Sequence, residues 1–174
     1  MDAQTVSSDL ADLRGLIAGG ASTASVSTDL AHEQSDLTQT QTDMNTVLGE
    51  STTAAPDSVC ADADTVQSDV IEVAADRDTV KGDLDSISAS ATSIQTAITT
   101  LQNDEAKLQR DEQGSQGVAP AGAPLPEEVQ QAITDAQAAA TVPTGALASA
   151  RSLLGQARAD QARSDAACHT ARGA

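Results

Sequence analysis

A small set of side chains is available for chemistry in this chain. Cys60 and Cys168 are its two cysteines, and His32 and His169 are its two histidines. The neighbours Cys168 and His169 invite the idea of an activated thiol, because a nearby imidazole can lower a thiol pKa. A disulfide partner at a helix end is the simpler interpretation, so we expect no reactive thiol.

Acidic residues gather in two short segments, 60–64 and 82–85. Neither segment has the spacing of a calcium-binding loop, and carboxylates two residues apart on a helix point in diverging directions. The histidines lack metal-site spacing, and no phosphate loop, nucleophile elbow or GxGxxG motif is present. Serines and threonines are plentiful but have no His/Asp context. We therefore expect no enzyme activity, no cofactor and no metal site.

Long helices must position these residues. Apolar residues recur every seven positions from Val59 to Leu108, and interleaved residues complete a 4-3 alternation. This heptad pattern predicts one helix over about 57–113, on the order of 80 Å long, with a narrow core-facing seam. The predicted core seam is Val59, Val66, Val70, Val73, Val80, Leu84, Ile87, Ile94, Ile98, Leu101 and Leu108. Arg77 and Glu105 also hold seam positions, where they either set the helix register or extend their stems to the bundle edge.

Two further arms flank this helix, at about 3–50 and 126–172. Gly19 and Gly20 interrupt the first arm, whose second apolar stripe resumes one residue out of phase and carries Glu33 and Thr40 in seam positions. Residues 51–56 read as a turn and 114–125 as a Gly/Pro/Ala linker. The third arm begins with Pro126 and is broken around Pro143 and Gly145.

Composition and arm lengths together indicate the fold class. The chain contains no Phe, Tyr or Trp, which argues against a thick globular core. Three arms joined by short connections fold back most simply as an antiparallel bundle. We predict an all-α, elongated, antiparallel three-arm helical bundle, coiled-coil-like, with arms one and three interrupted, forming a single domain over residues 1–174.

This layout places Cys60 and Cys168 at the same end of the bundle. Perfect helices would leave them roughly 15 Å out of level, but the linker and the break near Pro143 can remove that offset. We predict a disulfide closing a loop of more than a hundred residues, which would stabilise the fold by ~4–5 kcal/mol in the loop-entropy model. The alternative is a pair of small buried thiols.

The layout also brings the helix breaks level with one another. Gly19, Gly20, Pro143 and Gly145 would lie opposite a stretch of small polar residues, Ser86–Ser93. Two interpretations stay open. The breaks form a hinge or shallow pocket over residues 17–26, 86–95 and 140–147, or they are ordinary corrections to the phase of the coiled coil.

The net charge of −17, from 26 acidic and 9 basic residues, limits the classes of partner that this chain can bind. A chain this acidic should repel nucleic acid and anionic lipid, and no apolar run is long enough to insert into a membrane. An amphipathic lipid-surface role is opposed by the charge and by the missing Trp and Phe anchors. A protein partner or self-association is the expected interaction, with its identity unknown.

These patterns together favour a non-enzymatic structural or interaction module. We expect an extracytoplasmic helical spacer or docking rod, secreted or in the cell envelope, acting within a larger assembly. The predicted disulfide favours that location, since disulfides persist in oxidising compartments. No signal or tether is visible in this chain, and a cytoplasmic location stays open. The alternative function is a ligand-binding or sensory domain with a site near the breaks.

Overall fold

The computed structural model describes residues 3–20, 22–114, 124 and 126–173. Within these residues the chain forms five α-helices and no strand: α1 (Ala3–Gly19), α2 (Thr23–Glu50), α3 (Pro56–Gly114), α4 (Pro126–Ala139) and α5 (Ala146–Gly173). The predicted all-α helical bundle is confirmed. Most of the predicted 114–125 linker lies outside the described residues.

The helices gather into two compact units. Unit 1 contains Met1–Thr23 and Asp85–Val142, and unit 2 contains Ala24–Leu84 and Pro143–Ala174. Each predicted arm is therefore divided between the units. Helix α3 gives residues 56–84 to unit 2 and residues 85–114 to unit 1, whereas the first and third arms divide close to their predicted breaks.

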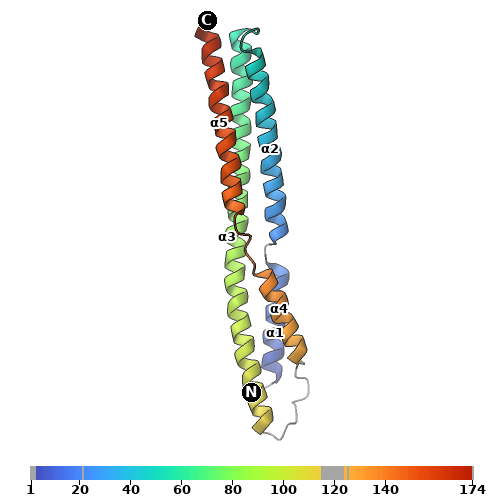
Figure 1. The fold of residues 1–174 in the computed structure, drawn as a ribbon. Helices are drawn as coiled ribbons and strands as arrows, with labels where there is room; N and C mark the ends of the chain where they lie inside the picture. The colour runs from blue at the N-terminus through green and yellow to red at the C-terminus, as the bar shows by residue number, and fades with distance from the viewer. Residues whose placement is uncertain (1–2, 21, 115–123, 125, 174) are drawn as a thin grey trace. The chain divides into compact units, whose positions relative to one another are not determined.

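Unit 1 is a three-helix arrangement of α1, α4 and the second half of α3 (Figure 1). Asp9 near the start of α1 faces Asp104, whereas Gly20 after its end lies against Ser90, so α1 runs antiparallel to α3. One continuous cluster forms the core. It consists of Val6, Leu10, Leu13, Ile94, Ile98, Leu101, Leu108, Val129, Ala132, Ile133 and Ala136.

Unit 2 packs α2, the first half of α3 and α5 together. One core cluster joins Met44 and Val47 of α2 to Val59, Ala63 and Val66 of α3 and to Ala167 of α5. A second cluster joins Leu37 to Val70, Val73, Leu154 and Ala157. Higher numbers on α2 and α5 thus meet lower numbers on α3, so both helices run antiparallel to α3. The core between the helices is narrow, because it is filled mostly by small aliphatic side chains and contains no aromatic residue.

The helix boundaries follow local signals. Helix α3 begins at Pro56, whose missing amide hydrogen would be unpaired at that position, and Asp57 places an acid in the first turn. Helix α4 begins in the same way, with Pro126, Glu127 and Glu128. Gly145 has a positive φ of 94° directly before α5, a backbone conformation that glycine adopts without a steric penalty.

The helices are rich in serine and threonine, which are weak helix formers. In many of them the side-chain hydroxyl donates a hydrogen bond to the carbonyl oxygen four residues earlier, as Thr38 does to Gln34 at 2.9 Å. Thr96 and Thr100 do the same along α3. These hydroxyls are thereby satisfied within their own helix, whereas the buried Ser164 Oγ has no hydrogen-bond partner among the described residues.

The structure buries ten of the eleven predicted seam residues, and the eleventh, Leu84, is half-buried. Leu84 is the last residue of unit 2 on α3. Arg77, also in the seam, is half-buried, and its guanidinium reaches outward to pair with Asp78 at 2.8 Å. Polar side chains share the buried seam of α2 and α5, since Glu33, Thr40 and Ser164 are all fully buried.

Candidate functional site

The two cysteines are joined by a disulfide inside unit 2. Cys60, in the first turns of α3, and Cys168, near the end of α5, have Cα atoms 4.7 Å apart. Cys168 packs against the core cluster that contains Met44 and Ala167. His169 is exposed, and Cys168 has no free thiol for it to activate.

The predicted hinge residues lie in different units. Gly19 ends α1 and Gly20 follows it in unit 1, whereas Pro143 and Gly145 belong to unit 2. Gly20 sits close to Ser90, because a Cβ added at Gly20 would lie 3.7 Å from the Ser90 Cβ and 3.3 Å from the Leu16 carbonyl oxygen. Of the predicted neighbourhood, residues 17–23 and 86–95 belong to unit 1, whereas residues 24–26 belong to unit 2.

A cavity of about 150 Å³ accompanies this close approach in unit 1. Ile17, Ile94 and Ala139 give it an apolar side, and Ser90 adds a hydroxyl. A space of this size accommodates a few ordered waters or a very small ligand.

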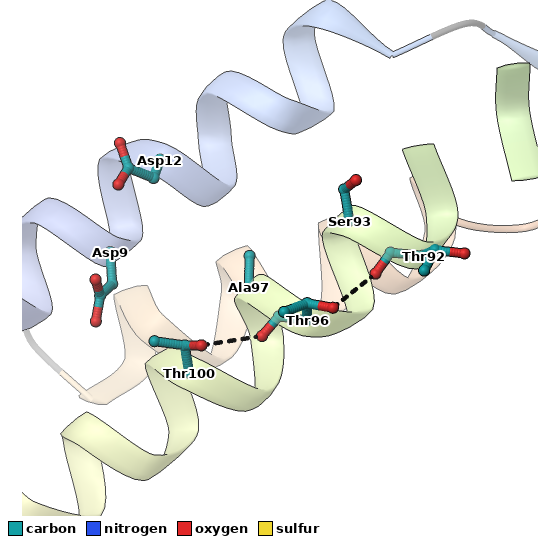
Figure 2. Close-up of a pocket in the computed structure, with 7 residues that line it drawn as sticks. All are labelled: Asp9, Asp12, Thr92, Ser93, Thr96, Ala97 and Thr100. Carbon is teal, nitrogen blue, oxygen red and sulfur yellow. Dashed lines mark hydrogen bonds between the residues drawn. The ribbon is translucent and has the colours of Figure 1, made fainter. Parts of the chain in front are cut away.

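A larger pocket of about 410 Å³ opens between α1 and α3 in unit 1 (Figure 2). Asp9 and Asp12 face it from α1, and small polar residues line it on α3: Thr92, Ser93, Thr96, Ala97 and Thr100. The hydroxyls of Thr96 and Thr100 are bonded to backbone carbonyls of α3, so they are not poised as nucleophiles. Burial and the facing Asp104 raise the pKa of Asp9, while Lys107, 2.7 Å from Asp104, lowers the pKa of Asp104.

Sequence reasoning missed a set of carboxyl pairs in unit 2. Three aspartates of α2 face three aspartates of α3 within hydrogen-bonding reach: Asp29 with Asp83, Asp36 with Asp76, and Asp43 with Asp69. All six side chains are half-buried. The sequence does contain one indication of these pairs, since aspartates recur every seven residues on both helices. This spacing places them on one edge of the seam at every second turn.

Burial and mutual repulsion alter the protonation of these pairs. Burial, and then the facing Asp43, raise the pKa of Asp69 to about 6. Burial also raises the pKa of Asp29, opposite Asp83, and the pKa of Asp76, opposite Asp36. Like charges at short distance disfavour a second ionisation, so each pair retains a proton more readily than two separate carboxyls would.

Glu33 is the most unusual acid of the unit. Its side chain is 0% exposed, and neither carboxyl oxygen has a hydrogen-bond partner among the described residues. Burial and then Asp76 raise the pKa of Glu33 to about 7, and Arg77 opposes that shift. A carboxyl placed in this way favours its neutral form.

Among the residues that the structure describes, no group of three or more His, Cys, Asp or Glu side chains could hold a metal ion. None of the described helices is both long and apolar enough to cross a membrane. Comparison with protein families, curated proteins and solved structures finds no match to this chain.

Proposed function

We propose that this chain is a non-enzymatic structural module that acts outside the cytoplasm, as a helical spacer or docking element within a larger assembly. The supporting observation is α3, a helix of 59 residues whose seam supplies the core of both units. A long helix whose residues serve the cores of both units is better suited to separating two attachment points than to forming an active site. The disulfide is compatible with an oxidising compartment and supports the proposed location, secreted or in the cell envelope.

Small-angle X-ray scattering of the oxidised full chain tests the spacer role. A compact domain of 174 residues would have a radius of gyration of about 16 Å. A spacer as long as α3, on the order of 85 Å, would have a radius of gyration of about 25 Å. A monomer near 25 Å supports the proposal, and one near 16 Å contradicts it. Light scattering over a concentration series gives the mass and detects the self-association that we also propose.

A ligand-binding or sensory role is a second candidate, supported by the cavity beside Gly20 and Ser90. A fragment screen by thermal shift on the wild type would identify a small, largely apolar ligand with a hydroxyl contact. Ser90→Val should abolish that shift by filling the cavity, whereas Ser68→Val, an exposed site in unit 2, should preserve it. An equal response of both variants would dismiss this site.

A further inference from the structure

The carboxyl pairs of unit 2 form a regular series along one helix interface. On α2 the acids are Asp29, Asp36 and Asp43, and their partners on α3 are Asp83, Asp76 and Asp69. Successive pairs are seven residues apart on both antiparallel helices, or roughly 10 Å along the axis. At each of these three positions, a carboxyl group of α2 therefore faces a carboxyl group of α3.

Glu33 provides a second, independent observation at the same interface. It lies between Asp29 and Asp36 on α2, is fully buried, and leaves both carboxyl oxygens without a partner among the described residues. The buried Oδ2 atoms of Asp69 and Asp76 likewise accept no hydrogen bond from a described donor, because the carboxyl that faces each of them can donate only when it is protonated. A buried carboxyl without a donor lacks the stabilisation that its ionised form requires, and a proton removes this deficit.

The chemistry of a facing carboxyl pair sets the direction of the response. Two carboxyls within hydrogen-bonding reach are held together when one proton lies between them, because the protonated group donates to its ionised partner. After both ionise, neither can donate and like charges oppose each other. Ionisation thus converts each attractive contact between α2 and α3 into a repulsive one.

The surrounding charges modify this response. From α2, His32 lowers the pKa of Asp29 and Asp76. From α3, Glu72 adds to the negative charge around Asp69, and Arg77 lowers the pKa of Glu33. The ionisable groups of α5 are Arg151, Arg158, Asp160, Arg163, Asp165, His169 and Arg172, and its buried member, Asp160, pairs with Arg163 at 3.4 Å.

We propose that the α2–α3 interface of unit 2 is a proton-sensitive clamp, which tightens in mild acid as protons bind between the facing aspartates and on Glu33, and loosens as these groups ionise toward neutral and alkaline pH. The ligand is the proton itself. The device couples the stability of unit 2 to the acidity of its surroundings, which the proposed spacer role does not require.

Unit 1 provides an internal contrast. Its pair, Asp9 and Asp104, is accompanied by Lys107, whose ammonium lies 2.7 Å from Asp104. The lysine supplies a positive charge that favours the ionised form of Asp104 at neutral pH. Burial and Asp104 still raise the pKa of Asp9, with Lys107 opposing, so unit 1 should contribute one proton-sensitive pair against the three pairs and Glu33 of unit 2.

The sign of the effect follows from linkage. Groups whose folded-state pKa is raised bind more protons in the native chain than in the unfolded chain, so the free energy of unfolding falls as pH rises. For these acids the loss runs from the ordinary carboxyl range up to the pKa of about 7 of Glu33. Stability should therefore be higher at pH 5 than at pH 8.

Thermal unfolding of the oxidised full chain between pH 5 and pH 8 tests the clamp, followed by far-UV circular dichroism because the chain has no aromatic residue. We expect the wild-type Tm to fall by about 5 °C or more, the size of shift that a change of one to two kcal/mol causes in a chain of this length. Asp36→Asn with Asp43→Asn should at least halve that fall. The matched control, Asp64→Asn with Asp165→Asn, removes the same charge from exposed positions of unit 2 and should keep the wild-type slope.

A wild-type Tm that is constant or rises from pH 5 to pH 8 overturns the proposal, as does a control that flattens the profile equally. If the paired variant fails to fold, carboxyl 13C titration of the wild type by NMR decides instead. Protonation of Glu33 and of one member of each pair well above the ordinary carboxyl range supports the clamp. Ordinary titration of all seven acids overturns it.

Discussion

At the scale of single residues, the least expected feature is a glutamate in the apolar seam of α2. Its spacing in the sequence predicts a seam position, and the structure gives that position full burial without a hydrogen-bond partner among the described residues. Arg77 lies across the interface, but its guanidinium is paired with Asp78. Glu33 therefore lowers the stability of unit 2 whenever it is ionised.

Glu33→Met tests this cost. Methionine has a similar length and no charge, so the variant should be more stable than the wild type by about 1–3 kcal/mol at pH 8. The gain should shrink toward pH 4.5, because the wild-type carboxyl, with a pKa of about 7, becomes protonated there. Urea unfolding at the two pH values measures it. A variant less stable than the wild type at pH 8 would show that the Glu33 charge is compensated.

The pairing of residues was only partly predictable from sequence. The Cys60–Cys168 disulfide was predicted because the chain has one possible cysteine pair and the fold-back brings it together. The aspartate pairs were missed, although the acids repeat every seven residues, because pairing depends on the register between arms. A heptad pattern places residues on one face of a helix but does not say which partner residue they meet.

At the scale of the helices, boundaries were predicted closely where proline, glycine and acidic residues mark them. Pro56 and Pro126 begin α3 and α4, and Gly19 ends α1. These signals act locally through backbone geometry and unpaired amides, so they need no knowledge of tertiary contacts.

Two glycines of unit 2 should respond oppositely to the same substitution. Gly145 precedes α5 with a positive φ of 94°, so Gly145→Ala should destabilise the chain by about 1 kcal/mol or more. Gly155 lies exposed within α5, with nothing within 4 Å of an added Cβ, so Gly155→Ala should stabilise it by about 0.5–1 kcal/mol. Denaturant unfolding of the pair measures both effects. Equal effects of the two substitutions would contradict the positive φ of Gly145 in the turn before α5.

The seam of α3 should be energetically uneven. Ile94 is 1% exposed in the core of unit 1, and Ile94→Ala should cost about 2–5 kcal/mol by opening a cavity. Leu84 is only half-buried, so Leu84→Ala should cost clearly less. Calorimetric unfolding compares them. Similar losses would contradict the division of α3 between units at residues 84 and 85.

At the scale of the whole molecule, sequence predicted the all-α bundle but not its division into two compact units. The heptad pattern of α3 continues unchanged across residues 84 and 85, so nothing in its apolar spacing marks the boundary. The first and third arms carry the only visible signs, at Gly19–Gly20 and Pro143. These residues mark where helices end, whereas the units are defined by which side chains pack together.

The Cys60–Cys168 disulfide closes the chain covalently within unit 2, and we propose that it forms in an oxidising compartment. Intact mass spectrometry of protein secreted into an oxidising compartment, with alkylation before and after reduction, tests it most directly. We predict a monomer lighter than the reduced form by the two hydrogen atoms lost on oxidation, with both cysteines alkylated only after reduction. Two cysteines alkylated without reductant, or a disulfide-linked dimer, would contradict the fold-back closed between Cys60 and Cys168.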